Sequence, residues 1–345
     1  MARFRIKGVA VNHEVVLLVL LGALFVGFGL MEPAFFRARV FLDVFNIVGE
    51  IGIMALAMTY IISTAGVDLA VGYELQLSAI VFGMVWAATQ SFVLAIAAAL
   101  LAGLAAGAFN GLVISRTRVP PLVTTLATMY LFRGISMILA GTSVYTGFPA
   151  GFRAISTTRL FGVLPIQSLY LVAIFLILNY FYERGSLGRN LKAMGFNERA
   201  VIFSGVNVRA IKLGIYSLLG LLCGFAALVY VGRLAAARSS IGDDLNFKVI
   251  TAVLLGGTSI MGGVGSMKGT FLAVLIIGVL QKGFTLLNLS GNVFNFTVGT
   301  LLVLSLIAFA VTQNRAEREG KPAVTDTQVD EEPSVPTASE VRQDA

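Results

Sequence analysis

Four charged residues lie inside or beside long apolar segments, where an ionisable side chain usually marks a function. Asp68 and Glu74 belong to a glycine-containing interruption, whereas Glu50 and Arg133 lie inside two separate apolar runs. An acidic group in such a place can accept hydrogen bonds from a solute, bind a cation or proton, or brace a broken helix. Because Glu50 and Arg133 have opposite charges, we favour a structural ion pair between them over a proton relay.

Two glycine-rich interruptions, at 65–74 and 256–266, are the second candidate for chemistry. The first contains carboxylate, amide and phenol groups, and the second contains five glycines and three hydroxyl residues. Non-helical backbone at membrane depth is tolerated only where it is buried in protein or lines a cavity. Transporters use such breaks to direct free amides and carbonyls at a solute, and this mixture of groups suits a sugar. The alternative, which spacing alone favours, is ordinary turns with glycines for close helix packing.

Composition excludes a soluble protein and most enzyme classes. The 345 residues are 57% hydrophobic and only 12% charged, whereas soluble domains are about 25% charged. The single cysteine, Cys223, cannot form an internal disulfide, and the single histidine, His13, cannot build a histidine-based metal site. The glycine-rich segments lack the phosphate-loop spacing. We therefore expect a non-catalytic membrane protein that binds no nucleotide or other cofactor itself.

Ten apolar runs of about span length predict an all-α polytopic transmembrane bundle of about ten spans, some broken or short. The runs cover 15–31, 44–63, 75–89, 92–114, 122–140, 168–182, 213–231, 249–261, 270–284 and 294–311. The first run lacks a small-residue cleavage site, so we interpret it as an uncleaved span. Residues 1–13 and 14–312 are then an N-terminal segment and the transmembrane domain. The acidic segment 313–345 has almost no large apolar residue and is expected to be disordered.

Basic residues indicate the orientation of the chain. The net charge is +7, but the basic surplus lies between apolar spans, which argues against nucleic acid as a partner. Twelve Lys or Arg residues flank the loops on the side of the N-terminus, about twice as many as on the other side. Both termini are therefore expected in the cytoplasm of a multi-pass membrane protein, with 141–167 outside.

The connection 183–212 is the most charged internal segment and is far longer than an ordinary linker between helices, which has about 2–8 residues. Within it, the segment 195–205 is expected to form a short helix, capped by Asn197 and ended by Gly205. Such a helix outside the membrane can dock in a groove of a partner protein.

Several motifs in order resemble those of the membrane subunits of bacterial ATP-binding-cassette importers of the ribose/simple-sugar class. The segment 65–72 reads A-G-V-D-L-A-V-G, and N-G-L-V-I and P-P-L-V-T-T-L follow at 110–114 and 120–126. The glycine, asparagine and alanine spacing at 195–206 and the L-G-G-T-S-I-M-G-G-V-G-S run at 255–266 complete the pattern. This branched-chain amino acid/ribose permease-like family includes importers of rhamnose and autoinducer-2. Ala65, Ala70 and Val201 depart from its pattern.

The resemblance implies a permease subunit of the bacterial inner membrane that carries a monosaccharide or sugar-like solute. Its implied partners are a cytoplasmic ATPase, which holds ATP and Mg, a periplasmic sugar-binding protein, and a second permease subunit, identical or different. An ion-coupled secondary transporter that uses the intramembrane carboxylates is the alternative function. The predicted ATPase-coupling residues are Gly195, Asn197, Ala200, Val201, Ser204 and Gly205. The predicted solute-pathway residues are Gly66, Asp68, Gly72, Tyr73, Glu74, Gln76, Asn110, Gly257, Thr258 and Ser259.

Overall fold

The structure is a computed structural model that describes residues 3–6, 9–117 and 119–320, with side chains from His13 to Ile307 other than Arg118. Two compact units are present, Met1–Leu306 and Ile307–Ala345, and each is described by itself. The predicted tail beyond Gly320 and the orientation signals Lys7 and Arg118 lie outside the described residues.

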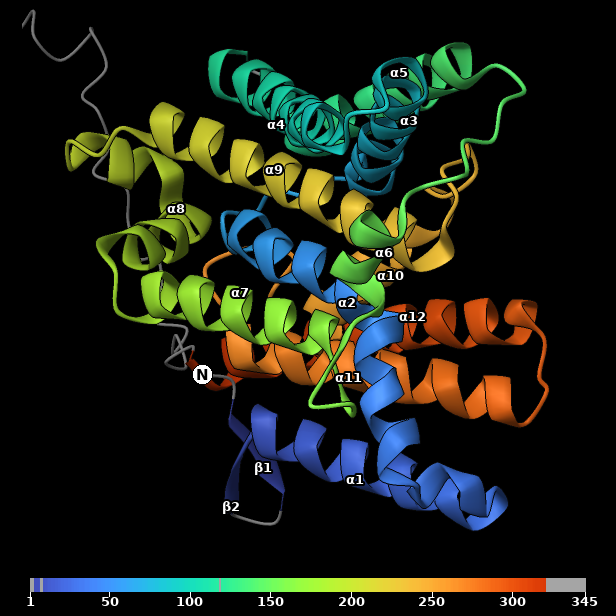
Figure 1. Cartoon of the computed structure of the whole chain (residues 1–345). Coiled ribbons are helices and arrows are strands. Elements are labelled where there is room, and N and C mark those ends of the chain that lie inside the picture. The colour runs from blue at the N-terminus through green and yellow to red at the C-terminus, as the bar shows by residue number, and fades with distance from the viewer. Residues whose placement is uncertain (1–2, 7–8, 118, 321–345) are drawn as a thin grey trace, which may run out of the picture. The chain divides into compact units, whose positions relative to one another are not determined.

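Helices make up most of the described chain (Figure 1). They are α1 (His13–Met31), η1 (Pro33–Phe36), α2 (Ala38–Ser63), α3 (Val71–Thr89), α4 (Phe92–Arg116), α5 (Pro121–Ala140), α6 (Ala150–Thr157), α7 (Ile166–Glu183), α8 (Ser186–Phe203), α9 (Val208–Leu234), α10 (Leu245–Leu255), α11 (Met267–Leu286) and α12 (Gly291–Gly320). Two short antiparallel hairpins, β1 (Arg3–Ile6) with β2 (Val9–Asn12) and β3 (Arg159–Leu160) with β4 (Leu164–Pro165), accompany them.

Each of the ten apolar runs falls on a helix, so the predicted polytopic bundle is confirmed. Eight helices are long and apolar enough to cross a membrane, and Leu245–Leu255 and Gly291–Ile307 are shorter apolar helices. Boundaries differ from the sequence prediction at several points. α3 begins at Val71, so the first break is only 64–70, and α10 ends at Leu255, six residues before the predicted end. α12 continues as helix to Gly320, past Gln313, where the prediction placed the start of a disordered tail.

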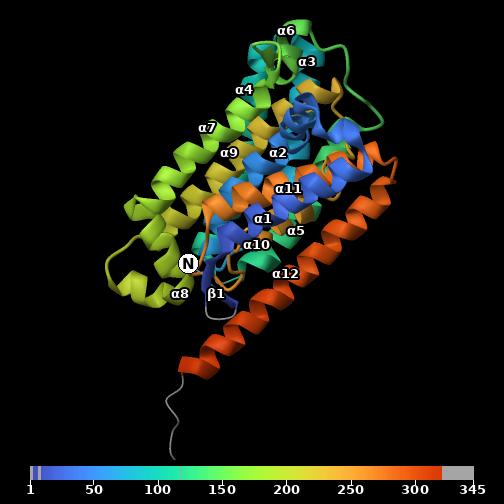
Figure 2. The same ribbon diagram turned by 90° about the horizontal axis from the view of Figure 1, so that it is seen from below.

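α2 is the central helix of the first unit. Every residue from Val48 to Ser63 is buried, because α7, α9, α10 and α11 pack around it (Figure 2). A helix that is apolar on all sides is stable only when it is buried on all sides, which explains the continuous apolar run in this part of the sequence.

Glycines bring α4 and α9 into close contact. A Cβ on Gly107 would lie 2.8 Å from the Cα of Gly220, and a Cβ on Gly220 would lie 2.7 Å from the backbone nitrogen of Gly107. Each helix has a second glycine four residues away, Gly103 on α4 and Gly224 on α9, which also lies at this contact. Small residues at a four-residue spacing let the backbones of two membrane helices approach closely. Figure 1 shows the two helices side by side, with α3 and α5 next to α4. This pair positions Asn110, which follows on α4.

Candidate functional site

The first break is held by hydrogen bonds to Asp68. Its Oδ1 accepts a bond from the backbone nitrogen of Ala70 at 2.7 Å, which closes a turn directly before α3. Its Oδ2 accepts a bond from Nδ2 of Asn110 on α4 at 3.2 Å, and the same Nδ2 donates to Oε1 of Glu74 at 3.0 Å. Thr125 on α5 donates to the carbonyl oxygen of Val67 at 3.1 Å. Three helices therefore fix the geometry of seven non-helical residues.

Burial decides what this cluster can do. Asp68, Glu74 and Asn110 each expose 0% of their surface, and Glu74 Oε2 and Asn110 Oδ1 have no hydrogen-bond partner among the described residues. A solute cannot reach side chains enclosed in this way in the conformation seen here. The arrangement matches the bracing role for Asp68 and places the carboxyl group of Glu74 directly beside it.

Gly66 and Gly72 allow the break to pack against other elements. A Cβ on Gly66 would lie 2.9 Å from the hydroxyl oxygen of Tyr216, and a Cβ on Gly72 would lie 2.6 Å from the carbonyl oxygen of Gly242. Both glycines therefore serve close approach, which is the packing alternative considered from the sequence.

Tyr73 and Gln76 point to a different place from Asp68. The hydroxyl of Tyr73 donates to Oδ1 of Asp243 at 3.0 Å, and Gln76 Oε1 accepts a bond from the backbone nitrogen of Gly242 at 3.1 Å. These contacts join the first turns of α3 to the loop that leads into α10. The residues predicted from the first break are thus divided between two places. Asp68 and Glu74 belong to a buried brace, whereas Tyr73 and Gln76 contact the loop before α10, which has exposed residues.

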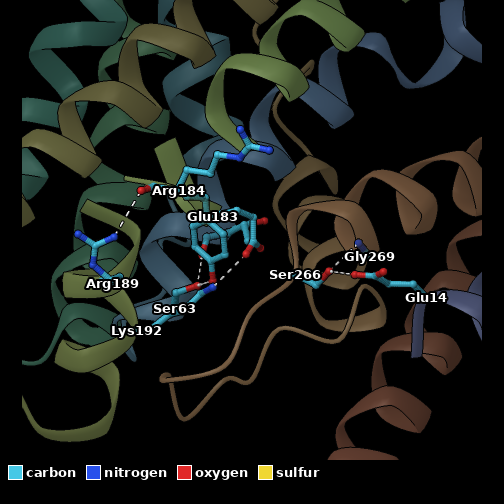
Figure 3. Close-up of polar contacts among 10 residues, drawn as sticks. Glu14, Ser63, Glu183, Arg184, Arg189, Lys192, Ser266 and Gly269 are labelled. Carbon is cyan, nitrogen blue, oxygen red and sulfur yellow. Dashed lines mark hydrogen bonds and ion pairs between the residues drawn. The ribbon is translucent and has the colours of Figure 1, made fainter. Parts of the chain in front are cut away.

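The second break lies beside the beginning of α1. The carbonyl oxygen of Leu255 is 3.0 Å from Nε2 of His13, and Ser266 donates to Oε1 of Glu14 at 2.9 Å while it caps α11 through Gly269 (Figure 3). Gly257, Thr258 and Ser259 belong to this region, and Thr258 and Ser259 are each only 2% exposed. The structure therefore does not bring these three predicted residues together with Asp68.

The two breaks do touch at one point, where α8 also meets them. The backbone nitrogen of Gly263 donates to the carbonyl oxygen of Ser63 at 2.9 Å, and a Cβ on Gly195 of α8 would collide with both groups. The hydroxyls of Ser63 and Tyr182 are 2.6 Å apart, and Lys192 lies 4.4 Å from the Tyr182 ring centroid and 3.6 Å from Glu183 (Figure 3). A movement of α8 would therefore act directly on both breaks.

α8 consists of two helical pieces rather than the single short helix predicted at 195–205. Asn197 has a non-helical backbone and divides the two pieces, and its Oδ1 caps the second by accepting a bond from the nitrogen of Ala200 at 3.0 Å. The helix ends at Phe203, and Gly205 follows with a φ of +81°. The predicted cap is confirmed, whereas the helical piece before Asn197 was missed because its sequence is polar and contains glycines.

The predicted coupling residues occupy two faces of α8. Val201 is buried with Met194 and Val208, so it stabilises the fold of the segment instead of presenting a surface. Ala200 and Ser204 are exposed. Sequence reasoning missed Phe196 and Phe203, which are 75% and 90% exposed. Large aromatic residues within a charged connection were the signal that could have identified them.

Glu50 pairs with a different residue from the one expected. Its carboxylate contacts the guanidinium of Arg233 on α9, and it is only 2% exposed. Arg133 instead lies over the ring of Tyr73, 5.7 Å from the centroid. The predicted Glu50–Arg133 pair is wrong because the two runs are separated in space, although a structural ion pair for Glu50 is present.

Within the part of the chain that the structure describes, no group of three or more histidine, cysteine, aspartate and glutamate side chains could hold a metal ion. The bundle, its buried helix breaks and its helical segment at one end define a membrane permease subunit. The chain belongs to the family described as branched-chain amino acid transport system / permease component, whose match covers residues 40–306.

Named relatives agree with this assignment. The autoinducer 2 import system permease protein LsrD of Klebsiella pneumoniae is 35% identical over 314 residues, which cover 88% of this chain and 93% of the relative. The ribose import permease protein RbsC of Escherichia coli is 36% identical over 284 residues, 80% of this chain and 87% of the relative. RbsC of Bacillus subtilis is 34% identical over 281 residues, with 81% and 87% covered.

Proposed function

We propose that this chain is the permease subunit of an ATP-driven importer for a monosaccharide or sugar-like solute in a bacterial inner membrane. The observation that carries the proposal is the position of α8, where Gly195 packs against Ser63 and Gly263 and so touches both helix breaks. A partner that moves α8 would transmit force to both. The relatives named for import of ribose and autoinducer-2 support a sugar-like solute.

The proposed partners rest on the family and on the relatives named as import permeases. A cytoplasmic ATPase, which holds ATP and Mg, docks on the exposed residues of α8, and a sugar-binding protein delivers the solute at the opposite end. A second permease subunit completes the pathway. Both termini lie in the cytoplasm: an even number of crossings puts them on the same side, and the bias of lysine and arginine residues indicates that this side is the cytoplasm. The chain itself performs no catalysis.

Co-purification and ATP hydrolysis test this proposal. The chain is co-expressed with a candidate ATPase, isolated by a tag on the permease, and reconstituted in proteoliposomes with a candidate binding protein. We expect a stable complex whose ATP hydrolysis rises when the binding protein carries its sugar. Uptake that needs an ion gradient but no ATP would contradict the proposal.

A further inference from the structure

α10 begins inside the membrane rather than at its surface. Its last residue, Leu255, contacts His13 at the first residue of α1, so this end lies at the α1 start. Eleven residues of helix extend about 16 Å, roughly half of a 30 Å hydrocarbon core. At the other end of α10, Asp244 accepts a bond from Nδ2 of Asn295 at 3.1 Å. Asn295 lies about 6 Å along α12 from Gly291, the first residue of that helix. The start of α10 therefore lies in the half of the membrane opposite α8.

Charged and polar side chains from separate elements gather at this start. Asp243 and Asp244 are exposed, and Asp243 accepts the hydroxyl of Tyr73 from α3. Arg133 of α5 is also exposed and lies over the Tyr73 ring. Gln76 exposes 0% of its surface, its Oε1 accepts a bond from the backbone nitrogen of Gly242, and its Nε2 has no partner among the described residues.

These charges do not face lipid. A charged residue exposed to the hydrocarbon of a bilayer is costly, so exposed charges within the membrane gather around water or a ligand. The neighbouring exposed residues of α5, Leu131, Ile135 and Ile138, are apolar as expected for a lipid-facing surface. The face that carries Arg133, Asp243 and Asp244 is therefore in contact with water and not with lipid.

The chemistry of this face suits a neutral solute with many hydroxyls. Each carboxylate uses one oxygen for Tyr73 or Asn295, which leaves the other oxygen to accept a strong, charge-assisted bond from a hydroxyl. The guanidinium of Arg133 supplies donors, and the buried Gln76 holds the loop beside them through its bond to Gly242. Two carboxylates face two cations, Arg133 and Lys248, the second of which interacts with Asp244, and this balance of charge disfavours an ionic solute of either sign. Phe247, three residues after Asp244 and 54% exposed, adds an aromatic surface.

We infer that Asp243 and Asp244, on a loop held by the buried Gln76, form with Tyr73 and Arg133 a site in the outer half of the pathway that contacts a neutral polyhydroxylated solute as it enters from the binding protein. The inference rests on the proposed function and specifies where the solute is held. It assigns Asp243, Asp244 and Arg133 a contact role, and it separates this site from the buried Asp68 brace.

Thiol accessibility tests the site. Asp244→Cys is made in a Cys223→Ser background, with Ile138→Cys as the matched control, because Ile138 is 82% exposed but lies on the apolar surface of α5. A small membrane-impermeant thiol reagent is applied from outside to cells that express the whole transporter. We expect Asp244→Cys to react roughly tenfold faster than Ile138→Cys, since a thiolate forms in water and not in lipid. Equal, slow reaction at both positions would overturn the site.

Protection identifies the class of ligand. The labelling of Asp244→Cys is repeated with a panel of pentoses, hexoses and methylpentoses at high concentration, and with sodium or choline chloride. Slower labelling with one or more neutral sugars supports the inference. Protection only by the cations, or by none of the additives, would overturn it.

Uptake by the wild-type transporter in proteoliposomes separates the two proposals. ATP-dependent sugar uptake together with an unreactive Asp244→Cys would refute only the site. Loss of ATP dependence would refute the proposed function, whatever the labelling result.

Discussion

Asp68 shows how a single buried carboxylate can hold a break in a membrane helix. It accepts bonds from the Ala70 nitrogen and the Asn110 amide and is completely buried. Asp68→Ala would leave both donors unpaired, and each buried unpaired group costs about 1–3 kcal/mol. We expect reduced uptake and disturbed basal ATP hydrolysis in proteoliposomes, with Asp68→Asn less affected because it keeps the shape and one acceptor.

Three results would change this interpretation. Normal ATP hydrolysis with impaired uptake in Asp68→Ala would indicate a direct solute contact instead of a brace. Full activity in both variants would reduce Asp68 to a turn residue. If an ionophore abolishes wild-type uptake at constant ATP, the carboxylate takes part in ion coupling and the ATP-driven assignment fails.

The pair of Glu50 and Arg233 provides a second test at the scale of residues. Removing one partner of a buried ion pair costs about 3–5 kcal/mol, because the other charge is left without compensation. Arg233→Met should therefore lower the melting temperature in detergent markedly. Adding Glu50→Gln to this variant should restore part of the loss, because the buried charge is gone. Additive losses in the double variant would show that the two side chains are not coupled.

Among the elements, the α4–α9 contact depends on glycine. A Cβ on Gly107 would lie 2.8 Å from the Cα of Gly220, whereas a Cβ on Gly22 of α1 would meet nothing within 4 Å. Overpacking costs typically about 1–3 kcal/mol. Gly107→Ala should lower the melting temperature, and Gly22→Ala should leave it unchanged or raise it slightly, since alanine favours helix. Equal effects of the two substitutions would argue against tight packing.

α8 is the element expected to bind the ATPase. Phe203 is 90% exposed, so Phe203→Ala should leave folding intact while weakening association with the ATPase by roughly tenfold or more, as aromatic contacts commonly do at interfaces. Ala200→Glu places a charge on the same exposed segment and should prevent coupling. The matched control is Phe161→Ala, since Phe161 is 100% exposed between β3 and β4. Pull-down and stimulated ATP hydrolysis measure both effects. Full coupling in Phe203→Ala and Ala200→Glu would rule out this docking surface.

The orientation of the whole molecule can be tested with two exposed positions at opposite ends. Thr157 ends α6 in the predicted outside loop, and Ser204 follows α8 in the predicted cytoplasmic segment. In a Cys223→Ser background, an impermeant thiol reagent added to intact cells should label Thr157→Cys and spare Ser204→Cys until the membrane is opened. The reverse labelling would show that the molecule has the opposite orientation and that the bias of lysine and arginine residues had been misinterpreted.

The sequence determined the fold class, the apolar runs and the cap at Asn197, because these depend on local composition and on hydrogen bonds between residues close in the chain. It also identified the family through motifs at 65–72, 110–114, 120–126 and 255–266. These features can be recognised in the sequence alone, since a span needs only enough consecutive apolar residues to cross the hydrocarbon core.

Only the tertiary structure decided which residues act together. Glu50 meets Arg233 instead of Arg133, and Asp68 meets Asn110, 42 positions away in the chain. It also divided the predicted solute-pathway residues between a buried brace and the exposed edge beside Asp243. The physical reason is that partner choice depends on how helices far apart in the sequence pack, and the energy of a buried polar group depends on what encloses it, which no local pattern encodes.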